Sequence, residues 1–113
     1  MKDTIKKASD FKNIYTNGKS QASKNLVLYV LKSSVMERNR YGISVSHKVG
    51  NSVVRHTLIR RIREIYRKNV DKIKDGYDLI IVLRVGSDKT DFIKLNEEFL
   101  QLCKRQDILE KED

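Results

Sequence analysis

The chain has 113 residues, which is enough for one domain with a single modest core. Hydrophobic residues make up 39% and charged residues 35%, so the chain is globular but unusually rich in charge. Cys103 is the one cysteine and there are two histidines, which excludes an intrachain disulfide and a zinc cluster at the usual spacing. The net charge of +9 predicts an anionic partner, with nucleic acid as the first candidate. No apolar run reaches the ~18 residues of a membrane span, so we expect a cytoplasmic protein without a membrane partner.

The first part of the chain predicts one short helix followed by strands. Ser9 or Asp10 can cap this helix, and Gly18 suits a left-handed exit from it. The strands are identified by β-branched and aromatic content or by alternation of apolar and small polar residues. They are predicted at 26–31 and 41–46, with a shorter one possible at 19–24.

The second part predicts a helix, a strand and a helix. A long helix over about 52–69 follows the Gly50-Asn51 turn, and the apolar run 77–84 is typical of a strand buried on both faces. Phe92, Leu95, Phe99 and Leu102 mark a last amphipathic helix. We therefore expect a single domain over 1–113 of the α+β class: three helices and an about four-stranded mixed sheet in the order α-β-β-β-α-β-α. Residues 1–7 and 106–113 are expected to fray.

The helix over 52–69 has two opposed faces. The apolar face, which we expect to be buried, consists of Val54, Leu58, Ile62 and Ile65. The opposite face spans about 60° of arc and consists of His56, Arg60, Arg63 and Arg67. Only one acid, Glu64, lies between residues 50 and 68, so these cations are not neutralised locally. Arginine favours bidentate phosphate binding, so this face predicts a nucleic-acid contact, with a merely solvated charged face as the alternative.

Two further features allow more than one interpretation. The Gly50-Asn51 turn could offer backbone N–H groups to a phosphate, or Asn51 could simply cap the helix. Phe11, Tyr15 and Tyr29 would ordinarily pack in the core, although aromatic side chains on a sheet also stack on unpaired bases.

A catalytic site is hard to build from this sequence, so we expect the chain's own side chains not to perform chemistry. The remaining carboxylates are placed at turns and on the last helix, away from the basic face. They are Asp75, Asp78, Asp88, Asp91, Glu97 and Glu98.

The order and spacing of several motifs are similar to one known family. The strand Gly42-Ile-Ser-Val-Ser46, the segment Lys48-Val-Gly-Asn-Ser-Val-Val-Arg55, and Arg60, Arg63 and Glu64 resemble the signature of the bacterial ribonuclease P protein component. The resemblance covers about residues 6–105.

The chain departs from the family pattern at the opening of the basic helix. That opening is usually Arg-Asn-Arg, an apolar residue and Lys-Arg, whereas His56, Thr57 and Ile59 stand here for Asn, Arg and Lys. The literal Arg38-Asn-Arg40 precedes a strand and is not interpreted as the motif.

The resemblance implies a small α/β sandwich with a left-handed βαβ crossover, against the general right-handed rule. It implies binding to a large catalytic RNA that, with magnesium, removes the 5′ leader of precursor tRNA. Magnesium would act with that RNA, not at a dedicated protein site, and no DNA partner is expected. A cleft between the first helix and the sheet would hold the leader, with Arg60 and Arg63 near it. Its lining would be Phe11, Tyr15, Val27 and Tyr29. The expected RNA-binding residues are Lys48, Asn51, Arg55, His56, Arg60, Arg61, Arg63 and Arg67.

Three alternatives are weaker. A general RNA-binding or ribosome-associated module would share the basic helix but show no preference for precursor tRNA. A DNA-binding protein would need a partner helix before the basic one. A protein-only nuclease would need a carboxylate cluster to hold metal.

Overall fold

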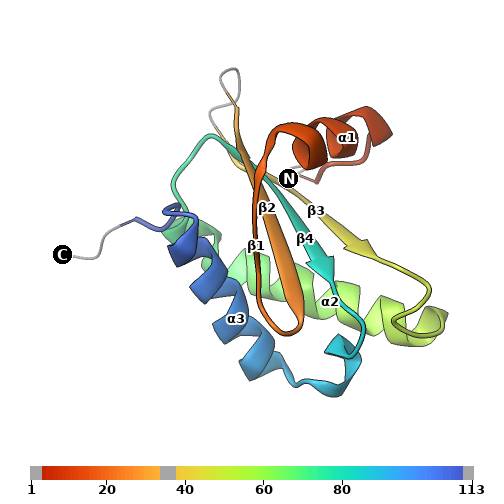
Figure 1. Ribbon diagram of the computed structural model, residues 1–113. Coiled ribbons are helices and arrows are strands. Elements are labelled where there is room, and N and C mark those ends of the chain that lie inside the picture. Colours follow the sequence, from red (N-terminus) through yellow and green to blue (C-terminus); the bar gives the residue numbers. More distant parts are fainter. Residues whose placement is uncertain (1–3, 34–37, 111–113) are drawn as a thin grey trace.

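The computed structural model describes residues 4–33 and 38–110 and contains three helices and four strands (Figure 1). In chain order they are α1 (Ala8–Asn17), β1 (Lys19–Ala22), β2 (Leu26–Lys32), β3 (Arg40–Val45), α2 (Ser52–Asn69), β4 (Tyr77–Leu83) and α3 (Phe92–Arg105). Two short 3₁₀ turns, η1 (Val70–Lys72) and η2 (Ser87–Lys89), follow α2 and β4. The predicted element order is confirmed.

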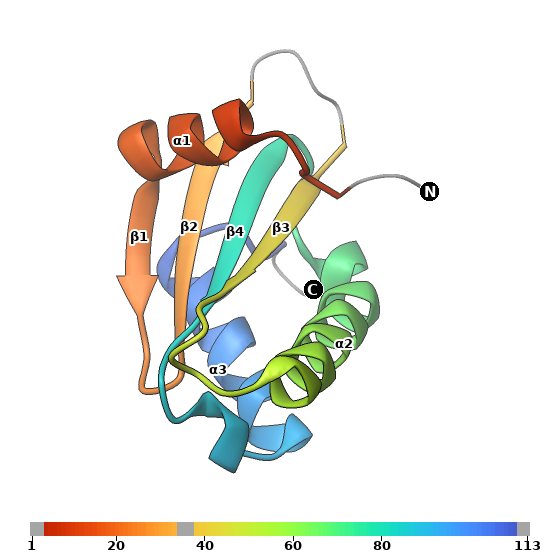
Figure 2. The same cartoon turned by 90° about the vertical axis from the view of Figure 1, so that its right-hand side faces the viewer.

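The four strands form one mixed sheet in the order β1-β2-β4-β3. β2 is antiparallel to both β1 and β4, whereas β3 is parallel to β4. Helix α1 covers one face of the sheet, and α2 and α3 cover the other (Figures 1 and 2). The connection from β3 through α2 to β4 is left-handed, so the crossover implied by the family resemblance is confirmed.

The larger core lies between the sheet and the pair α2 and α3. Alternate residues of the central strands point into this core, as the two-residue period of a strand requires. They meet the apolar face of α2, on which Leu58, Ile62 and Ile65 are at most 1% exposed. Strand β4 is buried on both faces as predicted, because Ile81 faces this core and Ile80 faces α1, both at 0% exposure.

Helix α1 docks on the opposite face through one apolar and one ionic contact region. Ile14 is fully buried with Ile80, and the Phe11 ring lies against Gly42, where a Cβ atom would be 2.7 Å from Phe11 Cζ. Arg40 of β3 then joins the helix to the sheet: it binds the buried Asp78 carboxylate with two bonds of 3.0 and 2.8 Å. A third contact of 3.5 Å runs from its Nη1 to Asp10 Oδ2 of α1.

The predicted ends of α1 are wrong in detail. Lys7, and neither Ser9 nor Asp10, stands at the N-cap, and it makes no side-chain cap because a lysine ammonium cannot accept a hydrogen bond. The Asp10 carboxylate is turned to Arg40. Gly18 has an extended backbone, with φ of −81°, because the chain passes directly into β1. A glycine is required there by close approach: a Cβ would lie 2.6 Å from Ile14 O.

The predicted fraying of both ends is wrong for the residues that the structure describes. Ile5 is buried and its N–H donates to Tyr41 O at 2.7 Å. At the other end, Ile108 is 1% exposed and accepts from Lys74 N at 2.7 Å. Residues 1–3 and 111–113 lie outside the described part of the chain. None of the helices in the described ranges is long and apolar enough to cross a membrane.

Candidate nucleic-acid interface

The outward face of α2 carries the predicted cations. His56, Arg60 and Arg63 are exposed, and a hollow of about 430 Å³ lies among them. The hollow is lined by Val53, His56, Thr57, Ile59, Arg60 and Arg63. Arg67 is also exposed, and it pairs at 3.2 Å with Glu64, whose own side chain is more than half exposed. Such an exposed pair is weak, so Arg67 can exchange it for a phosphate at little cost.

Several predicted RNA-binding residues at and after the start of α2 make hydrogen bonds within the protein. Asn51 caps the helix, because its side-chain oxygen accepts from Val54 N at 3.0 Å. Arg55 Nε donates to Gly50 O at 3.1 Å, and Arg61 Nη1 donates to Thr90 O at 3.3 Å. Lys48 in the preceding loop is exposed. Of these four side chains, Lys48 has the greatest freedom to meet an anion.

The predicted aromatic residues do come together on the α1 face of the sheet. Tyr15 meets Tyr29 edge-to-face with ring centroids 4.8 Å apart, and Phe11 lies 6.2 Å from Tyr15. Tyr15 is 38% exposed, while Phe11 and Tyr29 are partly buried against the small α1 core. Val27 lies two residues from Tyr29 along β2, so it shares the same sheet face. We refer to Phe11, Tyr15, Val27 and Tyr29 as the aromatic surface.

The basic face of α2 and the aromatic surface do not form one wall. Helix α2 packs against the face of the sheet opposite to α1 (Figure 2). Arg60 and Arg63 then point away from the core-facing residues Leu58 and Ile62, and thus away from the sheet. The expectation that Arg60 and Arg63 lie near the aromatic cleft is therefore wrong. The molecule instead presents two separate surfaces.

Comparison with known proteins shows the family to which the chain belongs. The family model of ribonuclease P matches residues 1–107. The chain belongs to the ribonuclease P protein component family. The relatives named "Ribonuclease P protein component" include one from Lachnoclostridium phytofermentans, 45% identical over 96% of this chain and 93% of its own. Another, from Clostridioides difficile, is 46% identical over 92% of this chain and 91% of its own.

Solved structures of the family have the same fold. The RNase P protein of Staphylococcus aureus superposes with a TM-score of 0.87 at 30% identity, covering 95% of this chain and 97% of that one. The Thermotoga maritima protein gives 0.82 at 32% identity, covering 90% and 96%. The family is the protein component of an endoribonuclease that acts with an RNA subunit in processing the 5′ leader of tRNA, and a general RNA-binding module is not favoured.

In the literal Arg38-Asn-Arg40, which the sequence analysis does not interpret as the family motif, Asn39 and Arg40 have structural roles. Asn39 is 5% exposed and its side-chain oxygen accepts from Tyr77 N at 2.8 Å. Arg40 is bound to two carboxylates, and its pKa is raised above its ordinary value because Asp78 accepts its hydrogen bonds. The residues that position α1 could not be recognised in the sequence, because Arg40 and Asp78 are 38 residues apart.

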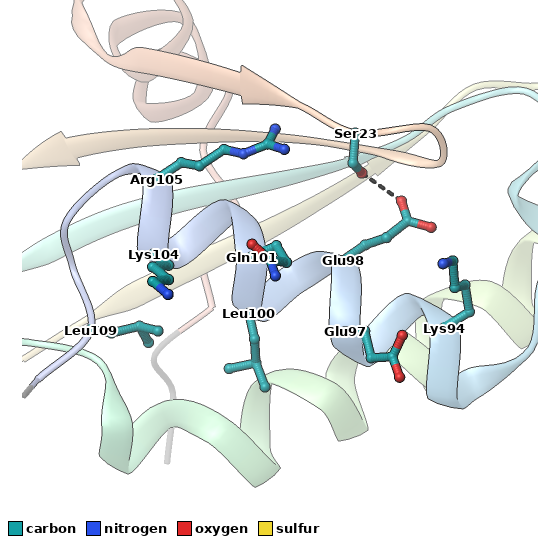
Figure 3. Close-up of a pocket in the computed structure, with 9 residues that line it drawn as sticks. All are labelled: Ser23, Lys94, Glu97, Glu98, Leu100, Gln101, Lys104, Arg105 and Leu109. Carbon is teal, nitrogen blue, oxygen red and sulfur yellow. Dashed lines mark hydrogen bonds between the residues drawn. The ribbon is translucent and has the colours of Figure 1, made fainter. Parts of the chain in front are cut away.

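A second hollow, of about 520 Å³, runs along α3 and contains none of the predicted site residues (Figure 3). Its carboxylate Glu98 is directed at the β1–β2 turn and accepts from Ser23 Oγ at 2.5 Å. Asn25 donates to the same carboxylate through its backbone N–H at 3.0 Å and its side-chain amide at 2.6 Å. Glu98 is thus a structural clamp between α3 and the turn.

The described residues contain no group of three or more His, Cys, Asp or Glu side chains that could hold a metal ion. One predicted placement of an acid is wrong: Asp78 lies within β4 and not at a turn. Asp88 of η2 lines a small hollow together with Arg61 of α2, a residue outside the predicted basic face.

Proposed function

We propose that this chain binds the catalytic RNA of ribonuclease P through α2 and binds the 5′ leader of precursor tRNA over the aromatic surface. The observation that carries the proposal is the one-sided basic face of α2, on which His56, Arg60 and Arg63 are exposed, while the helix itself contains one acid, Glu64. The helix is fixed by the burial of its other face, so these cations are presented without a conformational change.

The aromatic surface suits a single strand better than a duplex. Tyr15 and Tyr29 offer partly exposed rings, and Val27 extends the apolar area along β2. An unpaired base gains about 1–3 kcal/mol by stacking on an aromatic side chain, and this gain depends little on sequence. A leader of variable sequence is a strand of this kind.

In this proposal the protein binds and orients, while the RNA and its magnesium ions supply the hydrolytic chemistry. The +9 charge lowers the repulsion between two polyanions, catalytic RNA and precursor tRNA, that must associate. Lys48, Arg60 and Arg63 would neutralise phosphates on the RNA side. The cytoplasm, where tRNA is matured in bacteria, is the proposed location.

The leader assignment is tested by the affinity of the reconstituted RNA–protein complex for tRNA with and without a leader. Tyr29→Ala should lower the preference for the leader-bearing tRNA by about fivefold or more, the equivalent of one stacked base. Tyr29→Phe keeps the ring and should retain the preference.

Tyr77→Ala is the matched control, because Tyr77 packs against the core on the opposite face of the sheet. It should lower thermal stability without changing the preference for the leader. Equal binding of both tRNAs by the wild-type complex would contradict the leader assignment.

A further inference from the structure

A narrow hollow of about 170 Å³ lies between α2 and η2, beside the basic face of α2. It is lined by Val53, Val54, Thr57, Leu58, Arg61 and Asp88. Half of the lining residues are apolar, since the side chains of Val53, Val54 and Leu58 are hydrocarbon. Thr57 adds little polarity, because its hydroxyl donates to Val53 O at 3.0 Å within the helix.

The walls of this hollow, which we call the α2–η2 slot, are held together. Arg61 Nη1 donates to Thr90 O at 3.3 Å, which ties α2 to the chain that leaves η2. Val53 is 72% exposed and therefore forms an apolar projection at the edge of the slot. A flat apolar ligand would be enclosed between this projection and η2.

Asp88 gives the slot its chemistry. The side chain is partly exposed, and among the residues that the structure describes it has neither a hydrogen-bond partner nor an ion-pair partner. A carboxylate repels phosphate, so the edge of the slot formed by Asp88, unlike the one formed by Arg61, is unsuited to the RNA backbone. An ionised carboxylate only accepts hydrogen bonds, and the exocyclic amino groups of cytosine, adenine and guanine are donors at the edge of an unpaired base, besides the ring N–H of uracil and guanine and the 2′-hydroxyl.

The neighbouring surface suits the rest of the nucleotide. The slot shares Val53 and Thr57 with the hollow that contains His56, Arg60 and Arg63. An amino-bearing base in the slot would therefore have cations directly beside it for its phosphate. Proteins bind an unstacked nucleotide by packing against its base and by hydrogen bonds to the edge of the base. The slot offers apolar walls and an acceptor for the base, and the adjoining arginines are cations for the phosphate.

We propose that the α2–η2 slot binds one unpaired, amino-bearing base of the catalytic RNA, with Asp88 accepting a hydrogen bond from its amino group. The proposal rests on the proposed function, because it takes α2 to be the surface that meets that RNA. It makes Asp88 of η2 a determinant of sequence preference beside α2, whose own proposed contacts are to phosphate.

The test compares two variants that each remove one negative charge, Asp88→Ala and Glu97→Ala, the latter on the exposed surface of α3. Affinity for a bacterial ribonuclease P RNA is measured at fixed salt with the full chain. Charge alone predicts that both variants bind the polyanion more tightly. We expect Glu97→Ala to do so slightly, whereas Asp88→Ala should weaken binding by about fivefold or more.

Short oligonucleotides keep the proposal testable if Asp88→Ala changes the fold of η2. Wild-type protein should bind oligo(C) at least about threefold more tightly than oligo(U), because uracil has a carbonyl where cytosine has its amino group. Tightening of RNA binding by Asp88→Ala to the extent of Glu97→Ala, or equal affinity for the two oligonucleotides, would overturn the slot assignment. Failure of the wild-type chain to bind the RNA at all would instead contradict the proposed function.

Discussion

Glu98 shows how one buried residue organises a turn that is remote in sequence. The residue is 8% exposed, and its carboxylate receives three hydrogen bonds from Ser23 and Asn25. Burial by itself would raise the pKa of Glu98, but these hydrogen bonds favour the ionised form and lower the pKa below its ordinary value of 4.5. The charged carboxylate is therefore a stabilising component of the native state.

The lowered pKa of Glu98 makes the free energy of unfolding depend on pH. A carboxyl whose pKa is lower in the folded than in the unfolded chain stabilises the fold above about pH 4.5, and this stabilisation is lost as the pH falls through the folded pKa. Glu98→Gln should lower the free energy of unfolding at pH 7 by about 1–3 kcal/mol and flatten its acid dependence. Urea unfolding at pH 7 and below pH 4 measures both effects. The exposed neighbour Glu97 is the control, and an unchanged acid slope in Glu98→Gln would refute the assignment.

Residues of this kind were beyond sequence analysis. The sequence places Glu98 on the last helix but does not predict its hydrogen bonds, because its partners Ser23 and Asn25 lie more than seventy residues away. The sequence does suggest that aromatic side chains of the first helix and the strand at 26–31 share one face. The structure brings together Phe11, Tyr15 and Tyr29.

At the scale of elements, the position of α1 depends on Arg40. Loss of this guanidinium leaves the Asp78 carboxylate, with a side chain only 8% exposed, without its bidentate partner. Arg40→Met should lower the free energy of unfolding by about 2 kcal/mol or more. Arg67→Met removes an exposed pair of α2 and should cost less than about 0.5 kcal/mol. Equal effects of the two substitutions in urea unfolding would show that Arg40 does not anchor α1.

Helix α2 makes a different prediction, about salt. Arg60→Ala with Arg63→Ala should weaken RNA binding and reduce the slope of log affinity against log salt by about 1.5, because each lost phosphate contact contributes about 0.7–0.9. Lys94→Ala with Lys104→Ala removes the same charge from the exposed surface of α3 and should change the slope less. The same slope change in both double variants would mean that the basic face of α2 is merely solvated.

Both faces of α2 could be predicted from the sequence, because the 3.6-residue period of a helix decides which side chains share a face. It could not predict which side of the sheet α2 covers. That choice depends on the left-handed crossover, which places Arg60 and Arg63 opposite the aromatic surface. The position of the Asp88 carboxylate beside α2 could not be predicted either, since η2 meets α2 only in the folded chain.

At the scale of the whole molecule, the sheet separates two surfaces of different chemistry. Helix α2, which carries the cations, lies on one side of the sheet, and α1 lies on the other (Figure 2). The aromatic surface is on the α1 side. In the proposed function, such a two-sided protein can hold the catalytic RNA and the leader at once without competition between them. A protein with a single RNA-binding wall would have to share that wall between the two ligands.

The most direct test is reconstitution with a bacterial ribonuclease P RNA at low magnesium, followed by cleavage of precursor tRNA. Added protein should restore removal of the 5′ leader under conditions in which the RNA alone is slow, and protein without RNA should cleave nothing. Leader removal by the protein alone, or no acceleration of the RNA by the wild-type chain, would contradict the account.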